Sequence, residues 1–417
     1  MSKLCIQGDT RLVGDVKISG AKNAAVAILP ATILVEGITI IENLPNINDV
    51  AILNEAIISM GAVTKFLDLH TLEIDATTIY KYSATEPCIS KMRASYYLLG
   101  ALLGRFKKAE VAMPGGCDFG GRPIDQHIKG FRALGANIEI EDNIIKINAD
   151  RLIGTRIYLD MVSVGATINI MLAAVLAEGT TTIENAAKEP HIVDVANFLN
   201  KMGAKIIGAG TDVIRIKGVS KLHGGHYNIV PDQIEAGTFM LIAAATKGDI
   251  CVRNIIPEHM DSLTSKLREI GVTLIEGDDY IRVIWKQKLT ATQIITLPYP
   301  GFPTDLQPQM LVSLLQAQGV STIVESIFDN RFQYVDELRK MGANITIDGT
   351  KASIEGVDTL YGANLVATDL RAGAAMIIAG LVAKGTTTID NVRYIDRGYE
   401  DIEKKLTALG AQIFRID

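Results

Sequence analysis

The amino-acid sequence predicts an α/β protein of two similar domains, each built from three copies of one unit, with helices inside and sheets outside. Two observations lead to this prediction. A Gly-Ala or Gly-Val dipeptide recurs along the 417 residues at intervals of 68 to 74 residues, and a fixed period indicates a repeated structural unit. The same kinds of segment flank every dipeptide. A chain of this length also exceeds one ordinary core, so two domains are expected. The repeated glycines are Gly61, Gly135, Gly203, Gly271, Gly342 and Gly410.

Each unit is predicted to run strand, buried helix, strand, amphipathic helix and two strands. The segment before each glycine, such as QYVDELRKM (333–341), is amphipathic, and glycine commonly ends a helix. The segments after it, such as ANIEIEDNIIKINA (136–149), alternate as a β-hairpin does. Farther upstream lies a helix that is apolar on most sides, such as AGTFMLIAAATKG (236–248). Such a helix must be surrounded by protein.

The best candidate for the boundary between the two sets of three units is the Gly- and His-rich segment SKLHGGHYN (220–228), which we interpret as a linker. Its two histidines, His223 and His226, lack a third ligand and are not expected to bind a metal. The first buried helix needs a strand ahead of it, and DVKIS (15–19) is expected to supply that strand. Periodicity alone leaves open whether residues 1–20 pack with the first domain or cross to the second.

Composition excludes several classes of protein. The net charge of −6 argues against nucleic acid or an anionic membrane as the main partner. The longest apolar stretch, 24–35, contains a proline and is too short to span a bilayer. Four cysteines without a CxxC pair suit a reducing compartment, and the N-terminus has no apolar signal core. We therefore expect a cytoplasmic protein in which Cys5, Cys88 and Cys251 are structural.

Charged residues gather at equivalent turns of the six units. The turns before the buried helices hold Lys22, Arg93, Ser163, Asp232, Asp305 and Arg371. The turns before the amphipathic helices hold Asn48, Arg122, His191, His259, Arg331 and Arg397. Half of these positions are Lys or Arg, although the helix macrodipole disfavours cations at a helix N-terminus. Solvated helix caps are the alternative, but the set as a whole indicates a multiply anionic ligand bound where backbone N–H groups are free.

One segment departs from the repeat: MPGGCDFGGRPIDQH (113–127) is too rich in Gly and Pro for a regular element. Its Cys117 is therefore not expected to be a core residue, and the nearby Arg122 would favour the reactive thiolate. Asp305 and Asp369 each precede an apolar helix. Either residue could be an N-cap or a catalytic base, and spacing alone leaves both roles open.

Eight motifs, in order along the whole chain, resemble the UDP-N-acetylglucosamine 1-carboxyvinyltransferase (MurA) family of enolpyruvyl transferases. They are SGAKNAA (19–25), KMRASYYLLG (91–100), PGGCDFGGRPIDQH (114–127), SVGATIN (163–169), PGFPTDLQPQ (300–309), IFDNRF (327–332), ATDLRAG (367–373) and IDRGYE (395–400). The resemblance implies two domains, 21–229 and 1–20 plus 230–417. Each would be an inside-out α/β barrel of three βαβαββ repeats, with the active site in the cleft between them.

The resemblance also implies roles for particular residues, and it implies neither a metal nor a cofactor. The catalytic residues would be Cys117, Asp305, Lys22, Asp369 and Arg397. The residues that bind phosphoenolpyruvate would be Lys22, Asn23, Arg122, Arg331, Arg371 and Arg397. The residues that bind UDP-N-acetylglucosamine would be Asn23, Arg93, Arg122, Pro123, Ile124, Asp125, Gln126, Ser163, Val164, Gly165, Asp305 and Ile327.

The implied reaction transfers the enolpyruvyl group of phosphoenolpyruvate to the 3-hydroxyl of UDP-N-acetylglucosamine through a tetrahedral intermediate, with release of phosphate. It is the first committed step of peptidoglycan synthesis, and so serves cell shape and division. Asp305 would be the base, and Asp369 would assist proton transfer. Cys117 resembles the cysteine that fosfomycin alkylates, and it would donate a proton, hold an adduct or assist product release. The Lys and Arg side chains would stabilise the charge on phosphate and carboxylate without a metal.

Two rival interpretations are weaker. In 5-enolpyruvylshikimate-3-phosphate synthase the equivalent turn carries a Lys-Ser pair and the cysteine loop is missing, whereas here Asn23 follows Lys22. A catalytically silent nucleotide-sugar sensor would have lost the Cys, Asp and Arg set, and all of it is present. Phe119, Gln126 and Tyr394 stand where the family often has an aliphatic residue or histidine. Of these three, only Gln126 is expected to adjust the contacts to uracil.

Overall fold

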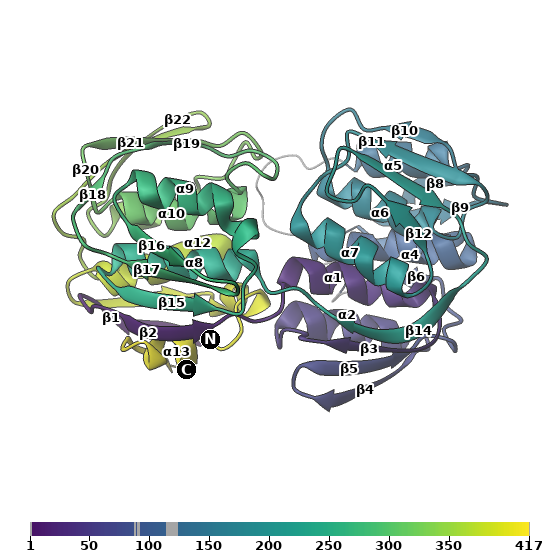
Figure 1. The fold of residues 1–417 in the computed structure, drawn as a ribbon, viewed down its shortest axis with the longest axis horizontal. Coiled ribbons are helices and arrows are strands. Elements are labelled where there is room, and N and C mark those ends of the chain that lie inside the picture. The colour runs from purple at the N-terminus through teal and green to yellow at the C-terminus, as the bar shows by residue number, and fades with distance from the viewer. Residues whose placement is uncertain (1, 87–88, 90–91, 114–123, 417) are drawn as a thin grey trace. The chain divides into compact units, whose positions relative to one another are not determined.

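The computed structural model describes residues 2–86, 89, 92–113 and 124–416, which form two compact units (Figure 1). Counting described residues only, the first unit spans residues 20–230, and the second unit contains residues 2–19 and 231–416. In these ranges the strands form six four-stranded sheets and one two-stranded sheet. No helix in the same ranges is long and apolar enough to cross a membrane.

The first unit contains three repeats, each with its own four-stranded sheet. The first repeat contains β14 (Leu222–Asn228), α1 (Lys22–Ala31), η1 (Thr32–Leu34), β3 (Val35–Glu42), α2 (Asn48–Ser59), β4 (Val63–Asp68) and β5 (Thr71–Asp75). The second contains β6 (Ser83–Ala84), η2 (Arg93–Tyr96), α4 (Tyr97–Phe106), β7 (Lys108–Ala112), α5 (Asp125–Ala133), β8 (Asn137–Glu141) and β9 (Ile144–Asn148). The third contains β10 (Arg156–Tyr158), α6 (Val164–Ala174), β11 (Thr180–Glu184), α7 (Pro190–Lys201), β12 (Lys205–Ile207) and β13 (Val213–Lys217).

The second unit repeats this plan. Its first repeat contains β2 (Val13–Lys17), α8 (Gln233–Ala245), β15 (Asp249–Arg253), η3 (Pro257–Met260), α9 (Asp261–Glu269), β16 (Thr273–Glu276) and β17 (Tyr280–Ile284). Its second contains β19 (Gln293–Ile295), η4 (Thr304–Leu306), α10 (Gln307–Leu314), β21 (Val320–Val324), α11 (Val335–Arg339), β22 (Asn344–Asp348) and β23 (Lys351–Glu355), flanked by the short pair β18 (Leu289–Thr290) and β20 (Ala317–Gln318). Its third contains β24 (Asn364–Val366), α12 (Leu370–Val382), β25 (Thr386–Asp390), η5 (Val392–Arg397), α13 (Ile402–Ala408), β26 (Gln412–Ile416) and β1 (Lys3–Gln7).

The six four-stranded sheets formed by the described residues have the same order and the same directions of their strands. In the sheet β10-β11-β13-β12, the strand before the buried helix is parallel to the strand after it. The two hairpin strands that follow then add antiparallel on the other side. A parallel pair needs a crossover connection, which the buried helix supplies. The predicted βαβαββ unit is therefore confirmed.

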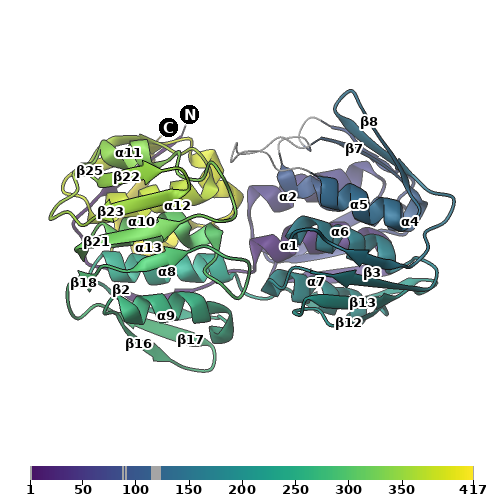
Figure 2. The same ribbon diagram turned by 90° about the horizontal axis from the view of Figure 1, so that it is seen from above.

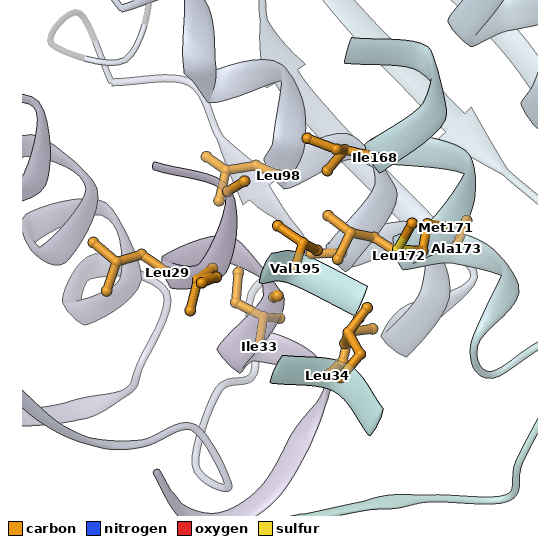
Figure 3. Close-up of a cluster of buried hydrophobic side chains, with 14 of the residues drawn as sticks. Leu29, Ile33, Leu34, Leu98, Ile168, Met171, Leu172, Ala173 and Val195 are labelled. Atoms are coloured by element: carbon orange, nitrogen blue, oxygen red, sulfur yellow. The ribbon is translucent and has the colours of Figure 1, made fainter. Parts of the chain in front are cut away.

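The apolar helices are the cores of the units. Every residue of α8 from Ile234 to Ala245 is buried, whereas the amphipathic α9 buries only Leu263, Thr264 and Leu267. In the second unit α10 packs against both α8 and α12 (Figure 2). In the first unit α4 packs against both α1 and α6, and Figure 3 shows side chains of these three helices meeting in the core. The predicted arrangement of helices inside and sheets outside is confirmed.

The segment 220–228 is a strand, so its interpretation as a linker was wrong. Residues Leu222–Asn228 form β14, which runs parallel to β3 with a bulge between His223 and Gly225. A Cβ atom at Gly224 would lie 2.2 Å from the backbone oxygen of Ile38. The glycine is therefore required by the close approach of two backbones and does not mark a flexible joint.

The strand expected ahead of the first buried helix belongs to another sheet. DVKIS does contain a strand, β2 (Val13–Lys17), but β2 runs parallel to β15 and completes a sheet of the second unit. Conversely β14, which precedes α8 in the chain, completes the sheet of α1 in the first unit. Each unit thus takes one strand from the chain segment that leads into the other unit's first helix.

The third repeat of the second unit is completed by the N-terminus. Among the described residues after α13 there is one strand, β26, and β1 lies between β25 and β26 as an inner strand. Leu4 and Ile6 of β1 are fully buried. The first residues of the chain are therefore part of the core of the second unit.

A buried carboxylate holds β14 in place. The Tyr227 hydroxyl of β14 donates to Asp194 Oδ1 of α7 at 2.5 Å, and the Val230 backbone N–H donates to Asp194 Oδ2 at 3.3 Å. Asp194 is 1% exposed. This burial raises its pKa to about 6, although both hydrogen bonds act in the opposite direction.

Candidate active site

Lys22 begins the buried helix α1 of the first unit. Its Nζ lies 3.1 Å from Asp49 Oδ2, and the Asp49 side chain is 1% exposed. Asp49 is in the first turn of α2, so two helix N-termini of one repeat meet in an ion pair. Asp49 partly offsets the positive charge that the α1 macrodipole disfavours. Sequence reasoning missed Asp49, although an acidic residue in the first turn of the next helix could have indicated it.

A second group of site residues surrounds His127 of α5. The Arg93 guanidinium lies 5.9 Å from the centroid of the Tyr96 ring, which packs at 5.6 Å against the imidazole of His127. Burial, and then the charge of Arg93, lower the pKa of His127 to about 4. The imidazole is thus neutral at pH 7. A Cβ atom at Gly165 would lie 2.9 Å from this ring, so the ring leaves no room for a side chain there.

The tautomer of His127 is set by Asn169 of α6. The Gly100 backbone N–H donates to Asn169 Oδ1 at 2.9 Å, which orients the amide. Asn169 Nδ2 must then donate to His127 Nδ1 at 3.0 Å, leaving the proton of the neutral ring on Nε2. Neither His127 nor Asn169 was among the predicted site residues, because buried polar partners have no periodic signature in a sequence.

The start of α5 is tied to the segment before α6. Gln126 is 4% exposed; its Oε1 accepts from the Asp160 N–H at 2.9 Å, and its Nε2 donates to Asp125 Oδ2 at 2.7 Å. Ser163 caps α6 by accepting from the Ala166 N–H at 3.3 Å. The predicted residues Ile124, Asp125 and Gln126 therefore lie close to the stretch that leads to Ser163, Val164 and Gly165. Cys117, Arg122 and Pro123 lie outside the described residues.

In the second unit, Asp305 lies between two buried arginines. Its Oδ2 accepts from Arg371 Nη2 at 3.0 Å, and its Oδ1 lies 3.7 Å from Arg331 Nη2. The Asp305 side chain is 29% exposed, whereas those of Arg331 and Arg371 are only 2% and 5% exposed. Burial alone would lower the pKa of Arg371, but Asp305, followed by Tyr399 and Asp232, raises it overall. The carboxylate is therefore partly exposed to solvent, and two buried guanidinium groups hold it in place.

The two candidate aspartates have different structural roles. Asp369 is the N-cap of α12, where its Oδ1 accepts from the backbone N–H groups of Arg371 and Ala372 at 2.9 and 3.1 Å. Asp305 is not an N-cap residue: it lies inside η4, whose N-cap is Pro303, and the N-cap of α10 is Leu306. Of the two roles left open by the sequence, Asp369 takes the N-cap.

Glu325 shapes the turn that contains Ile327. It is 1% exposed and accepts from the hydroxyls of Thr296 and Thr304 at 2.8 and 2.9 Å. It also accepts from the Ile327 N–H at 2.9 Å. Thr304 is next to Asp305, so Glu325 links the two predicted contact points for the sugar nucleotide. Arg397, the last residue of η5, is half-buried in the same unit.

Five members of the charged set predicted from the repeats thus lie in clusters with other polar residues of their own unit: Lys22, Arg93, Asp305, Arg331 and Arg371. Lys22 with Asp49, Arg93 with His127, and Gln126 with Asp160 belong to the first unit. Asp305 with its two arginines belongs to the second unit. Four-stranded sheets and buried helices position all of these groups, and each cluster lies at the start of a helix. Such positions offer free backbone N–H groups to anions.

Comparison with known proteins identifies the family. A family model described as EPSP synthase (3-phosphoshikimate 1-carboxyvinyltransferase) matches residues 6–406. A UDP-N-acetylglucosamine 1-carboxyvinyltransferase of Clostridium botulinum is 57% identical over 417 residues, covering 100% of both chains. UDP-N-acetylglucosamine 1-carboxyvinyltransferase 2 of Clostridium acetobutylicum is also 57% identical, over 100% of this chain and 99% of its own.

Solved structures share the fold. The enolpyruvyl transferase NikO from Streptomyces tendae has a TM-score of 0.91 and 26% identity, covering 99% of this chain and 98% of its own. An EPSP synthase from Acinetobacter baumannii has a TM-score of 0.79 over 100% of both chains, at 20% identity. These matches confirm the two-domain α/β fold class, and the relatives confirm the resemblance drawn from the motifs. The chain belongs to the UDP-N-acetylglucosamine 1-carboxyvinyltransferase family of enolpyruvyl transferases.

Proposed function

We propose that this chain transfers the enolpyruvyl group of phosphoenolpyruvate to the 3-hydroxyl of UDP-N-acetylglucosamine and releases phosphate, the first committed step of peptidoglycan synthesis. The observation that carries the proposal is 57% identity, over the full length of both chains, to a relative named for this acceptor and this group. The buried charged clusters are of the kind that such anionic substrates require.

The chemistry we propose is an addition followed by an elimination. The sugar 3-hydroxyl loses its proton to Asp305 as its oxygen bonds to C2 of phosphoenolpyruvate, while C3 gains a proton. In the second step C3 loses a proton, the bond between C2 and the phosphate oxygen breaks, and phosphate leaves. The Asp305 carboxylate is partly exposed, at 29%, and Asp305 is not an N-cap residue, which supports its role as the base.

Binding of phosphoenolpyruvate is assigned to basic residues at helix starts. Lys22, Arg122 and Arg397 would hold its phosphate and carboxylate, with Asn23, Arg331 and Arg371 contributing from neighbouring turns. The pairing of Lys22 with Asp49 supports this assignment, because it fixes the lysine at the start of α1, where free N–H groups add to the field. Asp369 would orient the start of α12 and, with it, Arg371.

UDP-N-acetylglucosamine is assigned to the turns around α5 and α6 and to the turns next to Glu325. Asn23, Arg93, residues 122–126, residues 163–165, Asp305 and Ile327 would make the contacts. The hydrogen bonds that join Gln126 to Asp160 support the grouping of the turns before α5 and α6 into one binding surface. Cys117 would act near the reaction as proton donor, adduct-forming residue or aid to product release.

A cytoplasmic location completes the proposal. Cys5 and Cys251 are buried free thiols, which suits a reducing compartment. Both proposed substrates are small phosphorylated molecules, and neither nucleic acid nor a membrane takes part in the reaction.

The runner-up function is enolpyruvyl transfer to shikimate 3-phosphate, which the description of the family model favours. One assay separates the two functions: phosphate release is measured with phosphoenolpyruvate and UDP-N-acetylglucosamine together, with each alone, and with shikimate 3-phosphate as the alternative acceptor. We expect phosphate only with the first pair. Phosphate release from phosphoenolpyruvate with shikimate 3-phosphate, but not with UDP-N-acetylglucosamine, would favour the runner-up. No release with either acceptor would refute enolpyruvyl transfer.

The role of Asp305 is tested in the same assay. Asp305→Asn is expected to lower kcat on the order of a hundredfold, as loss of a general base does. Asp336→Asn is the matched control, because Asp336 lies in the same unit with a side chain that is 78% exposed. Equal activity of the two variants would refute the role of Asp305 as the catalytic base.

A further inference from the structure

A buried polar network centred on the Tyr399 hydroxyl lies behind Asp305 in the second unit. Tyr399 is 3% exposed, and Gln309 and Thr238 are fully buried. The hydroxyl oxygen lies 2.9 Å from Thr238 Oγ1, 3.2 Å from Gln309 Nε2 and 3.4 Å from Arg371 Nη1. These residues come from α8, α10, α12 and the segment after η5. The network therefore joins helices from all three repeats of the second unit.

The direction of every hydrogen bond in this network follows from donor and acceptor chemistry. A phenol oxygen has one hydrogen and two lone pairs. The nitrogens of Arg371 and Gln309 can only donate, so both lone pairs of Tyr399 face them. The Gln309 hydrogen that points to Tyr399 is shared with Thr238 Oγ1, which lies 3.3 Å from Nε2. The Tyr399 O–H is then left for Thr238, whose own hydrogen goes to the Ile234 carbonyl at 2.8 Å. Burial raises the pKa of Tyr399, which keeps the phenol protonated for this purpose.

The network holds Asp305 at two points. Arg371 Nη2 donates to the side-chain Oδ2 at 3.0 Å, and Gln309 Nε2 donates to the backbone carbonyl of the same residue at 3.0 Å. The backbone carbonyl also fixes the orientation of the Gln309 amide, because its Oε1 would repel that carbonyl. Tyr399 accepts from both of these donors. It is therefore a common partner of two groups that hold Asp305.

We infer that Tyr399 is a positioning residue for the reaction: its hydroxyl fixes Arg371 and Gln309 so that the Asp305 carboxylate is aimed at the substrate hydroxyl. This inference rests on the proposed function, in which Asp305 is the base. Tyr399 itself touches no substrate group in this scheme. Its effect passes through Arg371 to the side chain of Asp305 and through Gln309 to its backbone.

The hydroxyl can be removed without losing the ring. The Arg371 guanidinium also lies 5.6 Å from the centroid of the Tyr399 ring, an attraction that phenylalanine would keep. Tyr399→Phe therefore deletes the hydrogen bonds and little else. Tyr227→Phe is the matched control, because it deletes a buried hydroxyl bound to the charged Asp194 in the other unit.

We expect Tyr399→Phe to lower kcat about tenfold, the effect of one lost hydrogen bond to a charged group, with KM for both substrates within about twofold of wild type. Tyr227→Phe is expected to leave kcat unchanged. A merely structural role for Tyr399 would lower the melting temperature and leave kcat per folded molecule intact, and that result would overturn the inference. Thr238→Val is the second variant; it removes the acceptor of the Tyr399 O–H, and a smaller fall in kcat is expected.

A double-mutant cycle tests the coupling without any substrate. Tyr399→Phe, Asp305→Asn and the double variant are unfolded in urea, and the shifts of the midpoints are compared. We expect the double variant to shift by less than the sum of the single shifts, because both changes disrupt one network. Additive shifts would overturn the inference. Inactivity of the wild-type protein with both substrates would instead refute the proposed function, and the urea cycle would still decide whether Tyr399 and Asp305 are coupled.

Discussion

Asp194 should make the stability of this protein fall as the pH rises through about 6. The carboxylate is 1% exposed, and burial raises its pKa from 3.8 to about 6. A group whose pKa is raised by folding binds its proton more tightly in the folded state. Its contribution to stability is therefore fully present below pH 3.8 and is lost as the pH rises through the folded value.

The size of the effect follows from the two pKa values. The whole change is about 3 kcal/mol, at about 1.36 kcal/mol per pKa unit. About 1.4 kcal/mol of it falls between about pH 5 and pH 8, the range in which unfolding is easily measured. Asp194→Asn removes the titration. It also replaces one carboxylate oxygen by an amide nitrogen, and the cost of this change is the same at every pH.

The measurement is urea unfolding of wild type and Asp194→Asn at several pH values. The difference between the two unfolding free energies should change by about 1.4 kcal/mol from about pH 5 to pH 8, in favour of the variant at high pH. Asp212→Asn, which alters an exposed aspartate, is the matched control. A constant difference for Asp194→Asn would mean that the carboxylate keeps an ordinary pKa, and the argument from burial would fail.

Three further outcomes are expected. Lys22→Gln should raise KM for phosphoenolpyruvate about tenfold or more, the effect of losing a charge-assisted contact; an unchanged KM in initial-rate assays would remove Lys22 from that site. Cys117→Asp should keep turnover and lose inactivation by fosfomycin; an adduct still detected by intact-protein mass spectrometry would place the alkylated residue elsewhere. Deletion of residues 2–7 should abolish the soluble fold, because burying Leu4 and Ile6 alone contributes about 5 kcal/mol; a soluble truncated protein with a normal circular dichroism spectrum would contradict the inner position of β1.

The sequence predicted the repeated unit well, because that unit is defined by local periods. The six glycines follow amphipathic helices, and 14 glycines with positive φ, including Gly61, Gly135, Gly203, Gly271, Gly342 and Gly410, occur in the described residues. Positive φ is the conformation that glycine adopts after a helix. The sequence did not predict which strand joins which sheet. DVKIS looks equally suitable for either unit, and its pairing with β15 depends on contacts far along the chain.

The strand at 220–228 was missed because its glycines have a nonlocal cause. HGGH has the composition of a loop, and only the approach of β3 at Gly224 explains why small residues are needed there. Strand propensity reflects packing against neighbours as much as the residue itself. A local pattern therefore could not distinguish this strand from a linker.

The residues of the candidate site also fall into those that local sequence patterns could predict and those that they could not. Charged residues at helix starts, such as Lys22, Arg93 and Asp305, could be found because their positions repeat from unit to unit. Asp49 could have been indicated by its place in the first turn of the next helix, but His127 and Asn169 could not, since they follow no period. Polar residues that are buried must have hydrogen-bond partners, but the sequence does not say which ones. That information exists only once the helices from different repeats are packed together.

The position of β1 also determines the order in which the chain can fold during synthesis. The first unit is complete once β14 has left the ribosome, because all its strands precede residue 230. β2, by contrast, must wait for β15, and β1 must wait for β25 and for β26, which ends at Ile416. Lys3–Gln7, with its apolar side chains, therefore stays without its partners until β25 and β26 have been made, as aggregation-prone segments do. The unit that begins the chain is the last to be finished.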